Sequence, residues 1–346
     1  MLYNANLTII VPAVLAFIAT VLATDFLMTY FYDAGVIAED RNKSRPTYVP
    51  SSGGVAVALG IIIGILAYTF GGSFIFTPIL RIDDLLAVGL SILMITLVGF
   101  IDDINVKTRR VAATGMKDIR KGLKQWQKPL LTFLGALPLM AINAGAHSLN
   151  VPFVGLVNLG VVYPIIIIPL LVIFVSNAVN LLGGFDGLQP GMTLVASLGI
   201  LVYEVFYGNY IGIVISAMLF TSILAFLPFN LYKSRIIPGD SFTYSVGGTL
   251  VAIMVMGNAE TFGAIIFIPW IAEFLLHLRR KFRVTDLGIR QKDGTFRAPY
   301  GRSIYSLTHL VMNMKKASET DVAKYLVALE AVFVVLGLAL KFSGLL

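Results

Sequence analysis

Stretches of about twenty mostly apolar residues recur along almost the whole chain, and this repetition constrains the fold more than any other feature. A helix needs about 20 residues to cross the hydrocarbon core of a bilayer, which is about 30 Å thick. Charged residues make up only 13% of the chain, about half their share in an ordinary soluble domain. The pattern predicts an all-α polytopic membrane protein and excludes a disordered or fibrous chain. The chain has no Cys, which also excludes disulfides and thiolate metal sites.

Ten of these stretches are interpreted as transmembrane helices, and the whole chain, 1–346, is expected to form one integral membrane domain. The first stretch has no basic segment before it and no small-residue cleavage site behind it. We therefore expect it to be retained rather than removed as a signal peptide. The expected spans are residues 6–31, 53–70, 85–101, 129–146, 160–176, 187–204, 209–227, 242–257, 260–278 and 325–343.

Lys and Arg are distributed very unevenly between the two sides of this ten-span topology. One side receives 24 of the 26 basic residues, and the other side receives only Arg81 and Lys341. Because basic loops stay in the cytoplasm, we expect a protein of the cell membrane with both termini outside. Since the basic residues lie between apolar runs, they predict contacts with membrane lipids and no nucleic-acid partner. The expected cytoplasmic segments are 32–52, 102–128, 177–186, 228–241 and 279–324.

Carboxylates share this basic side, and two of them, Asp102 and Asp103, are adjacent at the end of the third span. Neighbouring carboxylates repel each other and resist burial unless a cation or a proton compensates them. Oxygen ligands of this kind suit Mg²⁺, which is often held by one or two carboxylates together with phosphates and water. A solvated helix end is the alternative interpretation. Three further acids, Asp25, Glu273 and Glu330, lie inside spans, and we expect them to face a cavity or a partner rather than lipid.

Two more polar motifs follow the fifth and seventh spans. Asn177 and Asn180 lie three residues apart, so they share one face of a helix. The glycines after them, up to Asp186-Gly187, bring backbone N–H groups together in a way that suits phosphate or sugar oxygens. Asp240 precedes the eighth span, where it is either a helix cap or a metal-binding carboxylate. Each of these motifs also has a purely structural interpretation as a helix cap.

The last basic segment, 279–324, begins with an Arg-rich cluster at 279–283 that suits diphosphate oxygens or serves as a stop-transfer signal. An Asp-Gly pair at 293–294 predicts a small β-hairpin. Residues 302–316 place apolar side chains on one helical face, which predicts an amphipathic helix at the membrane interface.

Taken in order, these motifs resemble the polyprenyl-phosphate N-acetylhexosamine-1-phosphate transferase family. The resemblance begins at Arg45-Pro46 and continues through the motifs at 99–105, 177–188 and 229–242, so it covers nearly the whole chain. The segment Gly-Asp-Ser-Phe-Thr-Tyr at 239–244 is closer to the eukaryotic Gly-Asp-Thr-Phe-Cys-Tyr than to the bacterial pattern. The bacterial histidine motif of the last cytoplasmic loop is missing, since His309 stands alone there. The resemblance therefore implies the eukaryotic and archaeal branch, which serves protein N-glycosylation.

The resemblance implies transfer of GlcNAc-1-phosphate from UDP-GlcNAc to a polyprenyl phosphate such as dolichyl phosphate, with release of UMP. It implies Mg²⁺ as cofactor, with Mn²⁺ as a substitute, and a homodimer as the assembly. The acceptor phosphate has a second pKa of about 6, so the role of Asp102 as a base stays open. Lys124 and Lys121 are alternatives to Lys128 for the phosphate-holding lysine. The implied residues are Asn180 and Asp240 for the metal, Asp102, Asp103 and Lys128 for catalysis, and Asn105, Asn177, Asp186, Arg280 and Arg283 for the nucleotide sugar.

Three other functions are weighed against this one. A bacterial-type transferase would use undecaprenyl phosphate, or another UDP-HexNAc donor, for surface polysaccharide. A membrane transporter predicts acids at mid-membrane and related halves of the sequence, whereas the polar motifs here gather at one surface. A CDP-alcohol phosphotransferase needs an Asp-Gly-x-x-Ala-Arg core, but Asp186-Gly187 is followed by Leu188-Gln189-Pro190.

Overall fold

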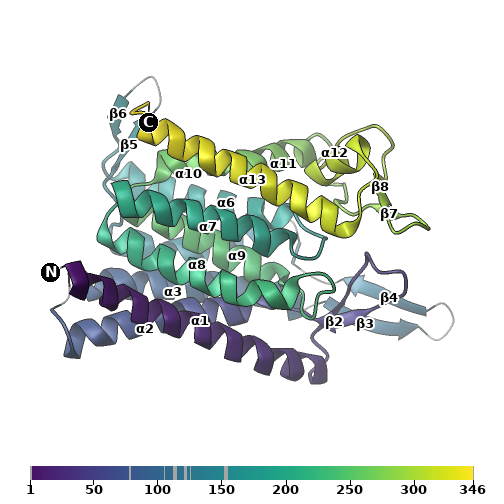
Figure 1. Ribbon diagram of the computed structural model, residues 1–346, viewed down its shortest axis with the longest axis horizontal. Helices are drawn as coiled ribbons and strands as arrows, with labels where there is room; N and C mark the ends of the chain where they lie inside the picture. Colours follow the sequence, from purple (N-terminus) through teal and green to yellow (C-terminus); the bar gives the residue numbers. More distant parts are fainter. Residues whose placement is uncertain are drawn as a thin grey trace.

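The computed structural model describes residues 2–77, 79–104, 106–111, 115–120, 123–124, 126–151 and 155–345. Its long helices lie side by side in one bundle (Figure 1). They are α1 (Leu2–Asp33), α2 (Gly54–Phe74), α3 (Ile82–Ile104), α6 (Ile168–Leu181), α7 (Leu188–Tyr207), α8 (Tyr210–Asn230), α9 (Gly239–Gly257), α11 (Ile268–Leu278) and α13 (Glu319–Phe342). Shorter helical segments are α4 (Gln127–Thr132), η1 (Phe133–Ala136), α5 (Leu137–Ala141), η2 (Tyr163–Ile167), α10 (Glu260–Ile266) and α12 (Leu307–Met314).

Short antiparallel strand pairs lie at the two ends of the bundle. They are β1 (Ile37–Glu39) with β2 (Tyr48–Pro50), β3 (Val106–Val111) with β4 (Gly115–Arg120), β5 (Ser148–Val151) with β6 (Gly155–Asn158), and β7 (Ile289–Arg290) with β8 (Phe296–Arg297). The β7–β8 pair flanks the Asp293-Gly294 turn. The two chain ends lie at the end of the bundle opposite to β3–β4 and β7–β8 (Figure 1).

Seven helices of the described chain are long and apolar enough to cross a bilayer, and the bent pair α10–α11 makes an eighth. The ten predicted spans are therefore not confirmed. The stretch 129–146 is broken into α4, η1 and α5, with Pro138 in the first turn of α5. The pair α10–α11 is bent by 58°, and Pro269 lies at the start of α11. Proline has no N–H to donate and clashes with the preceding turn, so it begins a new helical segment at both places.

The predicted span 242–257 is also not among the helices apolar enough to cross a bilayer. It lies in α9, at the centre of the bundle. Of the 19 residues of α9, 16 are buried, and the helix packs against α3, α6 and α8. A Cβ on Gly247 would lie 2.6 Å from the Cα of Ser176 in α6, so the close approach requires glycine. Because α9 contacts protein rather than lipid, its Ser, Thr and Gly residues are tolerated and its hydropathy stays below that of a lipid-facing span.

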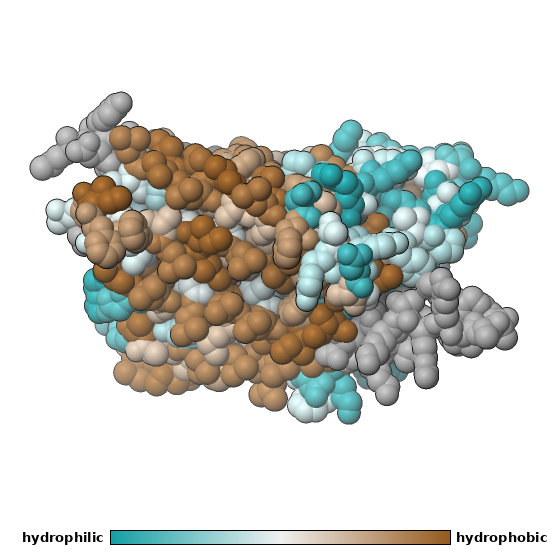
Figure 2. Space-filling model, turned by 90° about the horizontal axis from the view of Figure 1, so that it is seen from below, coloured by the Kyte–Doolittle hydropathy of each residue, from teal (hydrophilic) through white to brown (hydrophobic). Residues whose placement is uncertain are grey.

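The outer helices provide the apolar surface that the bilayer covers. In an apolar 18-residue segment of α1 only 28% is buried inside the protein, and in that of α13 only 22%. Figure 2 shows a broad hydrophobic face along the bundle and hydrophilic residues gathered at one end. These apolar helices make the chain an integral membrane protein.

The three acids within the predicted spans have different surroundings. Glu273 and Glu330 are buried, as predicted, and Glu273 accepts a hydrogen bond from the backbone N–H of Leu307 at 2.7 Å. Asp25 is exposed on α1, where it lines an open pocket with Leu22 and Phe26, in keeping with the expected cavity. Its apolar segment Leu7–Asp33 has 27 residues and is about 40 Å long. That exceeds the bilayer core of about 30 Å, so Asp25 can lie close to the headgroup region.

Candidate active site

Three predicted residues from distant parts of the chain meet at one ammonium group. The Nζ of Lys128, in α4, lies 2.6 Å from Oδ2 of Asp102 and 2.7 Å from Oδ2 of Asp240. Asp102 comes from the last turn of α3, and Asp240 from the first turn of α9. With Asp103, these residues are called the Lys128 cluster below. Of the three lysines considered from the sequence, Lys128 holds this place, while Lys124 is exposed and Lys121 lies outside the described residues.

Asp103 has a different environment from its neighbour Asp102. Its carboxylate accepts hydrogen bonds from the backbone N–H groups of Asp240, at 2.7 Å, and Ser241, at 3.1 Å. The first N–H groups of a helix have no partner within the helix and favour a negative charge. Asp103 therefore caps α9 and orients Asp240, whereas Asp102 interacts with Lys128 and accepts a hydrogen bond from the Leu123 N–H at 2.6 Å.

The two asparagines predicted from the sequence lie in the last turns of α6, which packs against α9. Asn180 is half-buried, and its side chain interacts with Tyr244, which in turn interacts electrostatically with Asp240 and Lys128. Asn177 donates from Nδ2 to Thr132 Oγ1 at 3.2 Å and thus contacts α4. The structure therefore brings Asn180 to the edge of the Lys128 cluster and uses the amide of Asn177 to fix α4.

The groups of the Lys128 cluster shift one another's ionisation. Burial by itself would lower the pKa of Lys128, but the charges of Asp240 and Asp102 raise the pKa well above its usual value, so the amine stays protonated. Burial raises the pKa of Asp240 to about 7 and that of Asp103 to about 6. The side chain of Asp240 is 24% exposed, so a cation can reach it. Carboxylate and amide oxygens are ligands that Mg²⁺ prefers, and the donor set of Asp240 and Asn180 fits that ion.

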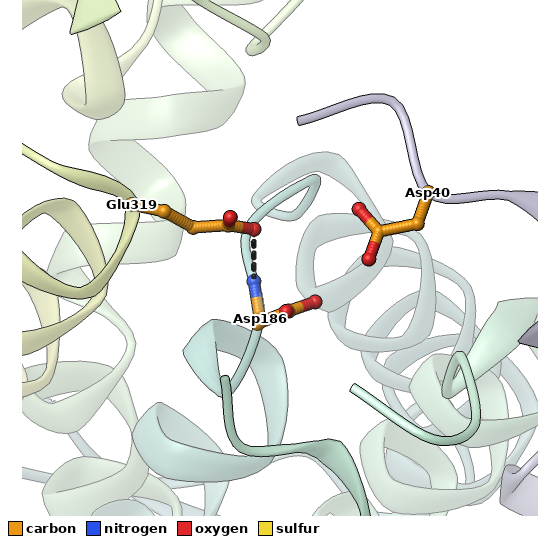
Figure 3. A group of neighbouring side chains, drawn as sticks. All are labelled: Asp40, Asp186 and Glu319. Carbon is orange, nitrogen blue, oxygen red and sulfur yellow. Dashed lines mark hydrogen bonds between the residues drawn. The ribbon is translucent and has the colours of Figure 1, made fainter. Parts of the chain in front are cut away.

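A second buried ammonium group is surrounded by carboxylates at the same end of the bundle. The Nζ of Lys43 lies 2.6 Å from Asp186 Oδ2, 2.9 Å from Glu319 Oε2 and 3.0 Å from Asp40 Oδ2. Figure 3 shows the three carboxylates converging from the β1–β2 loop, the α6–α7 loop and the start of α13. These four residues are called the Lys43 cluster below. Burial would lower the pKa of Lys43, but the hydrogen bonds to Asp186 and Glu319 raise it above its usual value.

Asp186 is the member of the Lys43 cluster that the sequence predicted. Burial raises its pKa to about 6, and the charges of Glu319 and Asp40 add to the rise, although the hydrogen bond from Lys43 opposes it. Its Oδ2 also accepts from the backbone N–H of Ser234, in the α8–α9 loop, at 3.0 Å. That loop leads directly to Asp240, and the α6 end that carries Asn180 leads to Asp186, so the two clusters share these segments.

Asp40, Asp186 and Glu319 also lie close enough together to hold a metal ion, since their carboxylate oxygens are within 4.8 Å of one another. The Lys43 ammonium, however, already lies between them, with hydrogen bonds to Asp186 and Glu319 and an ion pair with Asp40. A divalent ion there would have to displace this lysine.

Among the described residues, the predicted Arg side chains of the last loop take no part in the ion pairs of either cluster. Arg280 is exposed, and its guanidinium stacks on Tyr305 at 4.7 Å from the ring centre. Arg283 is also exposed. Asn105, the remaining predicted substrate residue, lies outside the described residues. The roles of these three residues stay predictions.

Sequence reasoning missed Lys43, Asp40 and Glu319 as a group. The first two lie two and five residues before Arg45, where the family resemblance begins, and Glu319 is more than 270 residues away. A charged residue at a loop or at a helix start is most often solvated, so no local pattern singled them out. The only signal that could have found them was that all three lie on the basic side of the predicted topology.

Comparison with known proteins finds relatives that share these segments. The model of glycosyl transferase family 4 matches residues 85–258, a range that contains the whole Lys128 cluster. A Saccharolobus solfataricus protein named as a UDP-N-acetylglucosamine–dolichyl-phosphate N-acetylglucosaminephosphotransferase is 31% identical over 337 residues, 97% of each chain. A Sulfolobus acidocaldarius protein of the same name is 26% identical over 341 residues, also 97% of each chain. A Clostridioides difficile phospho-N-acetylmuramoyl-pentapeptide-transferase is 31% identical over 218 residues, 61% of each chain.

Proposed function

Since this chain belongs to glycosyl transferase family 4, we propose that the Lys128 and Lys43 clusters form the pocket of a UDP-GlcNAc–polyprenyl-phosphate GlcNAc-1-phosphate transferase. An oxygen of the lipid phosphate attacks the phosphorus that carries GlcNAc. The bond from this phosphorus to the bridging oxygen breaks, and UMP leaves. The product is polyprenyl-diphospho-GlcNAc, the first lipid-linked intermediate of a glycan. One observation carries the proposal. The carboxylates of Asp102 and Asp240, contributed by two distant motifs, lie within 2.7 Å of the ammonium nitrogen of Lys128, which comes from a third.

The metal in this proposal is Mg²⁺, which Asp240 and Asn180 would hold. When bound, it neutralises charge on the diphosphate and polarises the phosphorus that is attacked. Mn²⁺, with the same preference for oxygen ligands, is the expected substitute. Asp103 keeps Asp240 in place through the backbone N–H groups of Asp240 and Ser241, in the first turn of α9.

The chain's own residues supply the remaining charge and orientation. Lys128 holds a phosphate oxygen and stabilises the negative charge that develops during transfer. Asp102 keeps this lysine protonated and directed into the site. A strong base is unnecessary, because the second pKa of a phosphate is about 6 and the acceptor is largely ionised at neutral pH. Asp186 and Asn177 line the nucleotide-sugar side, with Arg280 and Arg283 near the diphosphate.

The acceptor lipid and the side of the membrane that carries the active site are inferred from different observations. The full-length relatives are named as dolichyl-phosphate enzymes, and the pentapeptide-transferase matches a shorter part of the chain. This favours a dolichyl-type acceptor over undecaprenyl phosphate. The excess of Lys and Arg at the end of the bundle that carries both clusters favours a cytoplasmic active site in the cell membrane. Both chain ends lie at the opposite end (Figure 1).

The proposal is tested with purified protein in detergent, radiolabelled UDP-GlcNAc, dolichyl phosphate and Mg²⁺. We expect a labelled lipid product that disappears when EDTA removes the metal. Asp240→Asn should lower turnover by about 10³-fold, because it weakens metal binding and removes one of the two negative charges that Lys128 contacts. It should also weaken Mn²⁺ binding measured by electron paramagnetic resonance without substrate.

Asp293→Asn is the matched control, because Asp293 lies in the exposed turn between β7 and β8. Turnover of this variant should equal that of the unchanged protein. Equal turnover and equal Mn²⁺ affinity in Asp240→Asn would contradict the metal assignment.

A further inference from the structure

Glu319 is the first residue of α13, yet its side chain points into the protein rather than into solvent. Its side chain is 5% exposed. Ser318 and Asp321 form a capping box that holds this end of the helix, with the Ser318 Oγ accepting from the Asp321 N–H at 3.3 Å. Glu319 itself takes no part in that cap. Its carboxylate is therefore free to act on other segments from a fixed helix end.

The Glu319 carboxylate joins two loops that carry the nucleotide side of the site. Its Oε2 accepts a hydrogen bond from Lys43 Nζ at 2.9 Å. Its Oε1 accepts one from the backbone N–H of Asp186 at 3.2 Å (Figure 3). The Asn42 amide lies 3.4 Å from the same Oε1. One side chain thus connects the β1–β2 loop and the α6–α7 loop to α13.

The segment behind Glu319 is anchored to the same α6–α7 loop. The backbone N–H of Phe296, in β8, donates to the carbonyl of Ala317 at 2.8 Å. The Phe296 ring packs edge-on against Phe185, the residue before Asp186, with ring centres 5.6 Å apart. The carboxylate therefore reaches Asp186 from a support that already contacts the adjacent residue.

We infer that Glu319 is a positioning residue of the nucleotide-sugar pocket, which sets the place of both Lys43 and Asp186. The Lys43 ammonium donates hydrogen bonds to Asp186 and Glu319 and lies 3.0 Å from Asp40 Oδ2. Without the Glu319 acceptor, Lys43 keeps only Asp40 and Asp186, and the Asp186 N–H loses its partner. The inference rests on the proposed function in one respect, namely that Asp186 lines the pocket. Nothing in it depends on the metal assignment.

A purely structural role for Glu319 would lower stability without a selective loss of UDP-GlcNAc affinity. A positioning role instead predicts that Kd and KM for UDP-GlcNAc change more than kcat.

The experiment compares Glu319→Gln with Lys324→Gln, a control at an exposed residue of the same helix. Binding of UDP-GlcNAc is measured with Mg²⁺ and without acceptor lipid, so no turnover occurs. We expect Glu319→Gln to raise Kd and KM for UDP-GlcNAc about tenfold while kcat changes less than about threefold. Lys324→Gln should leave Kd and KM unchanged.

Asp186→Asn separates this inference from the proposed function. If Asp186→Asn weakens binding and Glu319→Gln does not, the inference about Glu319 is overturned and the pocket stands. If Asp186→Asn binds normally as well, the assignment of the pocket itself fails. Should Glu319→Gln not fold, Glu319→Asp replaces it, with an expected rise in Kd of about threefold. An unchanged Kd in that variant overturns the inference too.

Discussion

The Lys128 cluster and the Lys43 cluster contain the same groups, one ammonium and three carboxylates, but they compensate charge differently. Lys128 contacts two carboxylates, while the third, on Asp103, is satisfied by backbone N–H groups at the start of α9. Lys43 contacts all three of its carboxylates at 3.0 Å or less. In the Lys128 cluster, the side chain of Asp240 stays 24% exposed. The Lys43 cluster is internally paired.

This difference separates a chemical role from an organising one. The Lys128 cluster is built from the ends of α3, α4 and α9, which the bundle holds firmly. The Lys43 cluster is built mainly from loops, which are ordered by their shared ammonium. A buried charge pair is strongly destabilising when one partner is removed. We therefore expect the Lys128 cluster to govern turnover, and the Lys43 cluster to govern stability and nucleotide binding.

The largest expected effect on turnover is that of Lys128→Met. This variant removes the charge that faces Asp102 and Asp240, and kcat should fall by about 10²- to 10³-fold. The measurement is steady-state transfer to dolichyl phosphate. Lys124→Met, in the same segment but exposed, should keep normal turnover. A loss in both variants would show that folding of the segment, rather than the charge, is at issue.

The largest expected effect on stability is that of Lys43→Met. Three buried carboxylates lose the cation that they share, which costs about 3–5 kcal/mol of the free energy of unfolding. The midpoint of thermal unfolding in detergent measures this loss. Lys316→Met, at a lysine that is 87% exposed, should leave the midpoint unchanged. If Lys43→Met is as stable as the control, the cluster does not organise the loops.

A smaller effect is expected from pH, through Asp186. Its pKa is raised to about 6 in the folded protein, whereas an unfolded Asp titrates near 3.9. The folded state therefore binds more protons between these values, and stability contributed by this group falls as pH rises from about 4 to about 6. The slope is at most about 1.4 kcal/mol per pH unit. Unfolding of Asp186→Asn, measured across this range, should lack this component; an identical pH profile would remove Asp186 as its source.

The smallest effect is expected from Arg280→Gln. The Arg280 side chain is exposed and stacks on Tyr305, where solvent screens its charge. KM for UDP-GlcNAc should rise by less than about tenfold, with kcat nearly unchanged. Arg297→Gln, also exposed in this loop, is the matched control. A loss of turnover as large as that of Lys128→Met would place the diphosphate against Arg280 and not against Lys128.

Several parts of the site follow from the order of residues along the chain. Asp102, Lys128 and Asp240 each lie at the end of an apolar stretch. Charged groups are expensive within a bilayer, so such ends must gather at its two surfaces. The segregation of Lys and Arg then assigns them to a single surface. The amino-acid sequence by itself therefore determines the membrane class, the family and most members of the Lys128 cluster.

The tertiary structure decided how many stretches span the bilayer and which charged groups share a partner. Apolar length predicts a span only where a helix faces lipid. The protein-enclosed α9 carries Ser, Thr and Gly, and the proline-broken stretch from α4 to α5 lies against other helices. The contact of Glu319 with Lys43 joins residues 276 positions apart. Pairing across that separation depends on how the loops fold back onto α13, a property of packing that no local pattern encodes.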